Sequence, residues 1–470
     1  MKRVIFAILV IVITETAQAK YSGGSGEPND PYEIATPADI IDINNYPEDF
    51  NKCFLMTADV NLAPNIPGNR IFTSSLIGGT FSGIFDGAGH KICNLTIDNN
   101  SGEDDISFFR GVQNGQIKNL GLEDVNITAV NSQYISSLAA WSRYSAISNC
   151  YSSGNITGWA LLGGLIALND SIVIDCFSAC NLTGRNNSWL IGGIAAMNSI
   201  GTIINCHYSG NIVAPGTSSA IGGIAGQNNG IPGEEQGSIL NCYSTGSING
   251  GAGSSYLGGL AGYNKGVISN SVSAVNVAGD ANSSSIGGLV GINDSNIENS
   301  YSVGNVSGSD RIGGLVGFSG GKVKYSYSIG SVTGISRVGG LVGFASSPVL
   351  NCYFLITAGL NNHIGTALTD AQMKQQASFV NWDFVWESAN GTDDIWAICQ
   401  DVNYPKLAWQ FVVGDSDSDK DVDFIDFAPF GNKWMQPDST LYCGGQDLTG
   451  DGFVDIYDLD AFTENWLEGL

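Results

Sequence analysis

The sequence predicts an all-β fold: a parallel β-solenoid (β-helix) of about ten coils with capping segments, followed by a small α-helical calcium-binding module. Three observations support this prediction. One short unit recurs along most of the chain, only 13% of the 470 residues are charged while 63 are glycine, and the composition becomes acidic after residue 413. Five modules are predicted. They are a signal peptide (1–19), an N-terminal cap with the first coil (20–110), the repeats (111–356), a C-terminal cap (357–411) and the acidic module (412–470).

Residues 1–19 have the pattern of a secretory signal peptide. Lys2 and Arg3 form a basic start, residues 4–13 are mostly apolar, and small residues lead up to a cleavage site after Ala19. The apolar stretch is too short to span a bilayer, and no later segment is apolar enough for a transmembrane helix. The sequence therefore predicts an exported chain, secreted or held at a cell surface, with no transmembrane segment after cleavage.

The net charge of −25 argues against nucleic acid as a partner, because phosphates would be repelled. The acidic residues are unevenly spread. From Gly414 to Leu470 there are 14 Asp and Glu against 2 Lys, which gives −12. This shift in composition predicts a module boundary near residue 412.

The repeat is defined by a column that is mostly asparagine. Its unit is 26 residues at its shortest and 36 at its longest. Ile or Val stands two residues before each member, and Leu, Cys or Ser stands one residue after. The column consists of Asn94, Asn119, Asn149, Asp175, Asn205, Asn241, Asn270, Asn299, Tyr325 and Asn351.

Short runs with fixed apolar columns, separated by Gly, Ser and Asn turns, are typical of a β-solenoid. Each unit would form one coil, which buries its apolar face only by stacking on its neighbours. The two apolar positions around each Asn are three residues apart, whereas a straight strand alternates every two. We therefore expect a corner at the Asn, with its side chain bonded to backbone or to the Asn of the next coil. A β-propeller is the alternative, but its blades need about 40 residues.

Both flanks of the repeats predict caps. A helix is expected near residue 40, with Thr36 as N-cap, Pro37 at the first position and Asp39 closing a capping box. A second helix is expected after Thr369, with Gln372 in the same role. These segments would keep the terminal coils from pairing with other chains.

Four cysteines fall one residue after the Asn column, in adjacent coils. Cys is a small buried filler in such a column, and stacked Cβ atoms about 4.8 Å apart exceed the usual disulfide spacing of about 3.8 Å. We therefore favour free thiols over strained disulfides. The column consists of Cys150, Cys176, Cys206 and Cys242.

The repeats resemble the GLUG-motif repeat of secreted bacterial proteins. The motif core, glycine-leucine-hydrophobic-glycine, stands at residues 259–262, 288–291, 314–317 and 340–343, and weaker copies stand at 164–167 and 193–196. The resemblance extends over about residues 22–410. It implies a repeat architecture of secreted or surface proteins, some adhesin-like and some peptidase-associated, and the repeat itself implies no catalytic residue.

The solenoid offers little for catalysis. Carbohydrate-active sites need convergent carboxylates, or carboxylates with Arg or Lys, and the acids between residues 129 and 356 share no column. His207 falls in a column of aromatic residues and is interpreted as an aromatic substitute. We expect no enzyme activity, although a polysaccharide lyase or glycoside hydrolase remains the alternative. The acids are Asp170, Asp175, Glu234, Glu235, Asp280, Asp294, Glu298 and Asp310.

The acidic module carries two twelve-residue loops with oxygen donors at positions 1, 3, 5, 9 and 12, the pattern of an EF-hand-type calcium loop. An apolar helical face follows each loop, from Phe424 in the first and from Ile456 in the second. The sequence therefore predicts two bound Ca²⁺ ions. The ligands of the first loop would be Asp415, Asp417, Asp419, Asp421, Asp423 and Asp426, and those of the second Asp447, Thr449, Asp451, Phe453, Asp455 and Asp458.

This pair of loops resembles a type I dockerin, which docks on cohesin domains in cellulosome-like systems. The resemblance implies a possible cohesin-like partner for residues 412–470. Two departures weaken it. Lys420 stands where Gly makes the sharp turn, and Phe424-Ile425 and Ile456-Tyr457 replace the usual Ser-Thr recognition pair.

Two functions are consistent with this organisation. The first is a non-catalytic binding or adhesion protein of the cell surface or medium, attached or assembled through the calcium-dependent module. The second is a carbohydrate-active enzyme or polysaccharide-binding subunit of a cellulosome-like complex. In both, the solenoid would contact a polysaccharide or a surface ligand.

Overall fold

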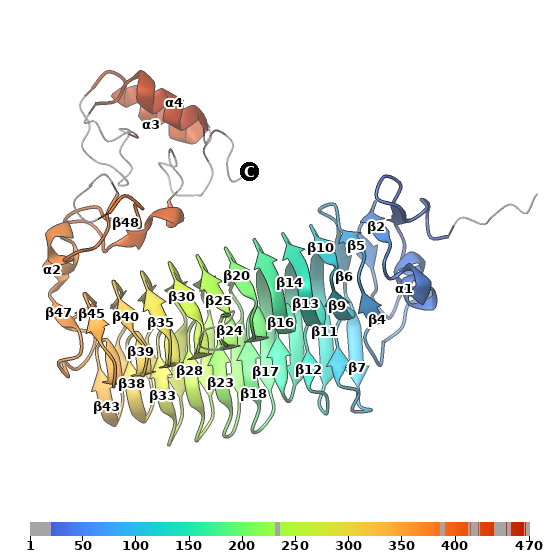
Figure 1. The fold of residues 1–470 in the computed structure, drawn as a ribbon, viewed down its shortest axis with the longest axis horizontal. Helices are drawn as coiled ribbons and strands as arrows, with labels where there is room; N and C mark the ends of the chain where they lie inside the picture. The colour runs from blue at the N-terminus through green and yellow to red at the C-terminus, as the bar shows by residue number, and fades with distance from the viewer. Residues whose placement is uncertain are drawn as a thin grey trace, which may run out of the picture.

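The computed structural model describes residues 20–230, 236–385, 391–411, 414, 422, 424–436, 448, 453–464 and 466. Those up to residue 368 form a rod of about ten stacked coils (Figure 1). The predicted parallel β-solenoid is confirmed. The predicted signal peptide, residues 1–19, lies outside the described residues. No helix among the described residues is both long and apolar enough to cross a bilayer.

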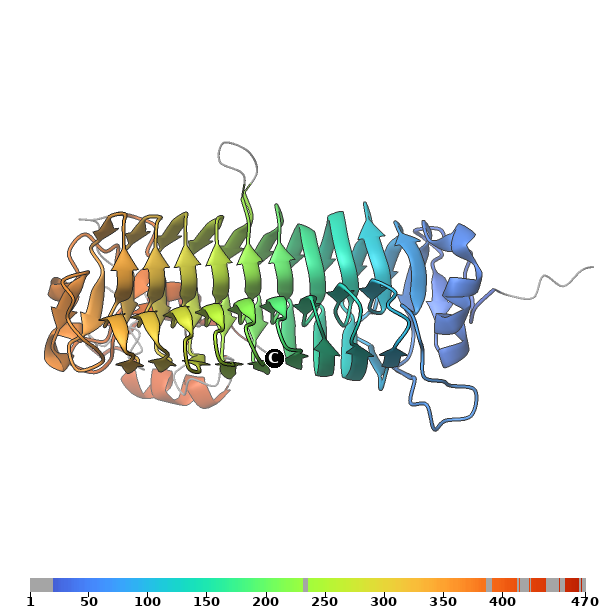
Figure 2. The same cartoon turned by 90° about the horizontal axis from the view of Figure 1, so that it is seen from below.

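Three sheets of parallel strands run along the rod (Figure 2), and each coil contributes strands to them in turn. Sheet 1 receives two strands from most coils. Its strands are β1 (Tyr32–Ile34), β2 (Cys53–Met56), β4 (Ile77–Phe81), β5 (Ile84–Asp86), β9 (Phe109–Gln113), β10 (Gln116–Lys118), β13 (Ala139–Ser148), β16 (Ile166–Ile174), β19 (Ala195–Asn198), β20 (Thr202–Ile204), β24 (Ala225–Asn228), β25 (Ser238–Leu240), β29 (Ala261–Asn264), β30 (Val267–Ser269), β34 (Val290–Asn293), β35 (Asn296–Glu298), β39 (Val316–Ser319), β40 (Val323–Lys324), β44 (Val342–Ala345) and β45 (Val349–Leu350).

Sheets 2 and 3 complete each coil. Sheet 2 contains β3 (Val60–Asn61), β6 (Lys91–Cys93), β7 (Thr96–Asn99), β11 (Gly121–Ala129), β14 (Tyr151–Gly158), β17 (Phe177–Gly184), β21 (His207–Tyr208), β22 (Asn211–Ala214), β26 (Tyr243–Ser244), β27 (Ser247–Gly250), β31 (Val272–Ser273), β32 (Asn276–Gly279), β36 (Tyr301–Ser302), β37 (Val306–Ser307), β41 (Tyr327–Ser328), β42 (Val332–Thr333), β46 (Tyr353–Leu355) and β47 (Thr366–Leu368). Sheet 3 contains β8 (Asp105–Ile106), β12 (Tyr134–Ile135), β15 (Leu161–Gly163), β18 (Trp189–Gly192), β23 (Ser219–Gly222), β28 (Ser255–Gly258), β33 (Ser284–Gly287), β38 (Asp310–Gly313) and β43 (Ser336–Gly339).

Nine of the ten members of the Asn column, from Asn119 to Asn351, form the corner between sheets 1 and 2. All ten members have a left-handed backbone, with φ between 47° and 61°, a conformation that Asn tolerates better than most residues. Several of their side chains bond from coil to coil. Asn149 Nδ2 donates to Asn119 Oδ1 at 2.9 Å, and Asn241 Nδ2 donates to Asn205 Oδ1 at 3.2 Å.

The predicted corner is confirmed for Asn119 and the later members, and the predicted side-chain bonding for those that form these bonds. The assignment of Asn94 to the column was wrong, because Asn94 lies within sheet 2 between β6 and β7 and follows Cys93, which pairs with Glu123.

The apolar columns beside this corner face the interior. Ile203, two residues before Asn205, is fully buried, and Cys206, one residue after, is 1% exposed. A second ladder of buried amides lies inside sheet 1, where Asn198 Nδ2 donates to Asn228 Oδ1 at 2.8 Å and Asn228 Nδ2 donates to Asn264 Oδ1 at 2.9 Å. This second ladder was not predicted, although the recurrence of Asn at 198, 228, 264 and 293 is a signal for it.

The cysteine column is reduced, as expected. Cys150, Cys176, Cys206 and Cys242 are buried and free, and so is Cys352. Cys399, in the C-terminal cap, is disulfide-bonded.

The N-terminal cap is built around α1 (Pro37–Asn45), which lies at the end of the rod (Figure 1). Thr36 accepts a hydrogen bond from the backbone N–H of Asp39, and the Asp39 carboxylate accepts one from the backbone N–H of Thr36. The predicted capping box is therefore confirmed. A 3₁₀ turn, η1 (Pro47–Asp49), follows.

The C-terminal cap has less helix than expected. Thr369 and Gln372 do form a capping box, but α2 (Asp370–Met373) is one turn long and gives way to the 3₁₀ turn η2 (Gln376–Ser378). The chain then forms the antiparallel pair β48 (Trp396–Ala397) and β49 (Lys406–Leu407) and the 3₁₀ turn η3 (Ala408–Gln410).

Two helices, α3 (Phe424–Lys433) and α4 (Ile456–Glu464), form the described part of the C-terminal module. Phe430 and Phe462 are buried between them, with ring centroids 5.2 Å apart. The predicted apolar face is only partly buried, because Phe427 is 42% and Ile456 is 59% exposed. The two short helices bury only a small core between them, and the other apolar side chains lie at the edge of this core.

Candidate functional site

A column of mostly aromatic side chains runs along the outer face of sheet 2. Its members stand in register from coil to coil, and the first three stack closely: the ring centroids of Tyr151 and Phe177 are 5.4 Å apart, and those of Phe177 and His207 are 4.8 Å apart. The interpretation of His207 as an aromatic substitute is confirmed. The column consists of Tyr151, Phe177, His207, Tyr243, Val272, Tyr301, Tyr327 and Tyr353.

The C-terminal cap covers only one half of this column. Trp382 and Trp396 pack over Tyr327, with ring centroids 6.2 and 6.0 Å from it, and the Tyr327 hydroxyl donates to the Pro405 carbonyl at 2.6 Å. A second contact reaches one coil further back, where Tyr301 donates to Gln410 Oε1 at 2.8 Å.

The other half of the column is open. Tyr151 and Phe177 are half-buried, and His207 is exposed. The solenoid therefore presents an uncovered aromatic surface on three coils of its N-terminal half.

The same coils carry a groove at the corner between sheets 2 and 3. The turn that joins β14 to β15 has two residues, 159 and 160, whereas the turns of the coils on both sides have four, at 130–133 and 185–188. A short turn between two longer ones leaves a hollow. The structure has a groove of about 690 Å³ here, lined by Val130, Asn131, Trp159, Arg185, Asn186 and Pro215.

Counted back along the sequence from sheet 3, Trp159 corresponds to a serine of the neighbouring turns, while the buried residue of its own two-residue turn is Ala160. Because Tyr134 pairs with Leu161 and Leu162 pairs with Ile191, Trp159 stands in register with Ser132 and Ser188, counted back from sheet 3. Both serines are buried, whereas Trp159 is 41% exposed.

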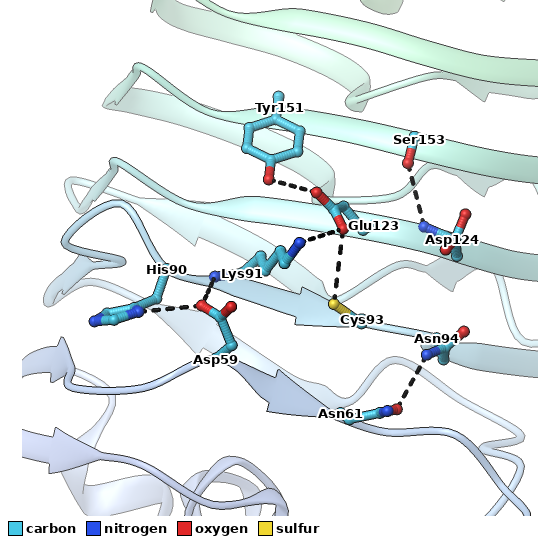
Figure 3. A network of polar contacts seen from close by, with 10 residues as sticks. All are labelled: Asp59, Asn61, His90, Lys91, Cys93, Asn94, Glu123, Asp124, Tyr151 and Ser153. Carbon is cyan, nitrogen blue, oxygen red and sulfur yellow. Dashed lines mark hydrogen bonds and ion pairs between the residues drawn. The ribbon is translucent and has the colours of Figure 1, made fainter.

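Ionisable side chains also meet on the first coils of sheet 2 (Figure 3). Glu123 pairs with Lys91 at 2.9 Å and accepts a hydrogen bond from the Tyr151 hydroxyl at 2.9 Å. Cys93 Sγ lies 3.9 Å from Glu123, and His90 bonds Asp59. This network of carboxylates, Lys, Cys and Tyr was not predicted from the sequence.

The pKa values of three groups in this network are shifted away from neutral pH. The hydrogen bond from Lys91 lowers the pKa of Glu123, burial and the bond to Glu123 raise the pKa of Tyr151 to about 12, and burial raises the pKa of Cys93. A general acid or base works best with a pKa near the operating pH. The network therefore fits coil pairing better than proton transfer.

The acids of the repeats do not converge. Among those that the structure describes, Asp170 pairs with Arg143 and Glu298 with Lys324, both on sheet 1, while Asp310 pairs with Arg337 on sheet 3. Glu234 and Glu235 lie outside the described residues.

The calcium prediction falls mostly outside the described residues, which is the case for Asp415, Asp417, Asp419, Asp421, Asp423, Asp447, Thr449 and Asp451. Of the remaining four, Asp426 and Asp458 at loop position 12 are fully buried, and Phe453 is 39% exposed. Asp458 accepts hydrogen bonds from the backbone N–H of Leu448 at 2.6 Å and of Asp455 at 2.7 Å. Asp458 therefore turns back toward the start of its loop, and this arrangement fits a loop that closes around a cation.

Comparison with known proteins identifies the repeats. The family described as the GLUG motif matches residues 217–249 and 282–307. Halomucin of Haloquadratum walsbyi is 32% identical over 177 residues, which is 35% of this chain but only 2% of the length of halomucin. The chain is thus a β-solenoid repeat protein that contains GLUG motifs.

One solved structure covers most of the chain. It is a candidate immunoglobulin A1 protease from Bacteroides ovatus, 17% identical, and the match covers 83% of this chain and 96% of that chain. The TM-score is 0.38, and at this value the similarity carries no argument about fold or function.

Proposed function

We propose that this chain is an exported, non-catalytic binding protein of the extracellular space or cell surface. The observation that carries the proposal is the uncovered part of sheet 2, where the stacked rings of Tyr151, Phe177 and His207 stay open while the cap covers Tyr301 to Tyr353. An ordered aromatic surface on a rigid rod is suited to recognition. The GLUG motifs and the similarity to halomucin support a repeat protein of this kind.

Lack of catalysis is part of the proposal. Among the described acids of the repeats, Asp170, Glu298 and Asp310 form ion pairs, on two different faces. The pKa values of Glu123, Tyr151 and Cys93 are shifted away from neutrality. These features favour binding over turnover.

Attachment through the C-terminal module is the second part. Two loops of calcium-loop pattern would hold Ca²⁺ with Asp426 and Asp458 at their last positions, and the binding free energy of Ca²⁺ would stabilise the folded module. A cohesin-like protein is the partner that the resemblance of the two loops to a dockerin implies. This part is tested by titrating the full mature chain with Ca²⁺ and measuring partner capture with Ca²⁺ and with a chelator. Capture that is equal in both conditions would contradict it.

Polysaccharide binding is the alternative that one observation favours, namely the groove with Trp159 and Arg185 at the corner of sheets 2 and 3. Aromatic rings stack on sugar faces, and Arg binds anionic groups.

The experiment for the binding surface uses the full mature chain on an array of immobilised polysaccharides and extracellular proteins. The test variant, Tyr151→Ser with Phe177→Ser, should lose at least one ligand of the wild-type chain. The matched control is Phe318→Ser with Phe344→Ser, which removes another stacked pair, 5.9 Å apart, on sheet 1. A test variant that keeps every ligand would contradict the assignment of this surface.

A further inference from the structure

We propose that the groove between residues 130 and 215 binds one anionic unit of a polysaccharide, a sugar that carries a carboxylate or a sulfate. The inference deepens the proposed function and rests on it. Four features of the groove support it: its shape, an exposed indole, a guanidinium without a carboxylate partner, and amide side chains on two walls.

The shape comes from turn length. A two-residue turn lies between four-residue turns, so Val130 and Asn131 form one wall, Arg185 and Asn186 the other, and Trp159 lies between them. The volume of about 690 Å³ lies in the range of about 300–1,000 Å³ that is typical of small-ligand sites.

Trp159 supplies a flat apolar surface. In the coils on both sides the residue that corresponds to it in sequence is a buried serine, and Ser188 bonds the carbonyl of Arg185 at 2.8 Å. Ser132 is buried without a hydrogen-bond partner for its Oγ. The indole of Trp159 is 41% exposed, and this exposed part offers a face to the apolar side of a sugar ring.

Arg185 supplies the charge. Its backbone N–H is bonded to Ser188, but its exposed guanidinium pairs with no carboxylate among the described residues, in a chain with a net charge of −25. By contrast, Arg143 lies over the ring of Trp141 at 5.4 Å and pairs with Asp170 at 3.5 Å. An unpaired guanidinium beside an indole is suited to a bidentate contact with a carboxylate or sulfate.

Asn131 and Asn186 complete the chemistry, because each exposed amide donates and accepts hydrogen bonds. A peptide would need deep apolar pockets for its anchoring side chains, and this groove has one indole, one Val and one Pro. The lining therefore fits a hydroxylated, anionic ring better than a peptide.

The test measures binding of the full mature chain to three immobilised polymers: polygalacturonate for carboxylate, dextran sulfate for sulfate, and dextran as the neutral reference. We expect binding to one or both acidic polymers and none to dextran. Arg185→Gln should weaken that binding about tenfold or more, since a charge-assisted hydrogen bond is lost. Trp159→Ser, which restores the serine of the neighbouring turns, should have an effect of similar size.

Arg143→Gln is the matched control, because it removes an arginine beside a tryptophan on another face of the rod, and it should bind like the wild type. Melting curves would show that each variant is folded. Equal binding of the acidic polymers by wild type, Arg185→Gln and Trp159→Ser would overturn the assignment of the groove as the binding site. Binding of dextran as strong as that of the acidic polymers would also overturn it. Both results would leave the proposed binding function in place. A lack of binding to all three polymers would also overturn the assignment of the groove. Binding to the array of extracellular proteins would then test the proposed binding function separately.

Discussion

The indole Nε1 of Trp409 donates a hydrogen bond of 2.9 Å to the backbone carbonyl of Asn270, a corner residue that lies 139 positions earlier in the chain. Tyr301 and Gln410 bond beside it. The C-terminal cap therefore does more than close the last coil, because it runs back along sheet 2 and ties several coils together.

The first prediction concerns this cap. Trp396 is fully buried against Trp382, Tyr301 and Tyr327, so Trp396→Ala should lower the free energy of unfolding by about 3–5 kcal/mol. Trp409→Phe is the control, because it loses one hydrogen bond and should cost about 0.5–1.5 kcal/mol. Denaturant unfolding measures both. An equal loss of unfolding free energy in the two variants would contradict this account. It would mean that contacts such as the hydrogen bond of Trp409 stabilise the cap as much as the buried side chain of Trp396 does.

The second prediction concerns the asparagine corner. Asn241 has a φ of 52° and donates to Asn205. Asn241→Ala should lower the free energy of unfolding more than Asn241→Gly does, because a side chain with a Cβ pays about 1–2 kcal/mol for the left-handed conformation. Thermal melting of the two variants measures the difference. A glycine variant that is as unstable as the alanine variant would show that the amide bond, rather than the backbone, dominates.

The third prediction concerns the thiols. Burial raises the pKa of Cys242 to about 12 and that of Cys352 to about 12, whereas Cys53 and Cys93 are half-buried. Titration with a thiol reagent at pH 8 should modify Cys53 and Cys93 first, and the column only on unfolding. Cys242→Ser should be tolerated, because Ser271 fills the same place in the next coil. Rapid modification of Cys242 in the folded chain would contradict this account.

The fourth prediction concerns pH. The ion pair with Lys91 lowers the pKa of Glu123 below the usual 4.5, so its stabilisation is present above about pH 4.5 and is lost as the pH falls through the folded-state pKa. The difference in free energy of unfolding between wild type and Glu123→Gln should therefore shrink as the pH falls from 6 to 3. Lys91→Gln should behave in the same way. A difference that grows in acid would contradict the sign of the shift.

The coils could be predicted because they repeat. The corner residue and the Ile or Val two positions before it recur in coil after coil, with Leu, Cys or Ser one position after it, and stacking places like residues above like. The position of the cap on sheet 2 could not be predicted, because the contact between Trp409 and Asn270 depends on a single non-repeating segment.

The groove was missed for a related reason. Its signal is a turn that is two residues shorter than its neighbours and a tryptophan in a row of serines, and both are visible only once the coils are in register. The network of Lys91, Glu123 and Tyr151 likewise joins three coils at positions where the sequence columns differ. Both features therefore lie where the sequence departs from the repeat pattern.

The central claim is recognition without turnover, and one measurement tests it most directly. The protein is incubated with each polysaccharide that it binds. Retained protein and newly formed polysaccharide chain ends are measured in the same sample. The account predicts stable retention, and no new reducing or unsaturated ends above the level of a heat-unfolded control. Chain ends that accumulate in proportion to time and protein would contradict it, and would make the solenoid a carbohydrate-active enzyme.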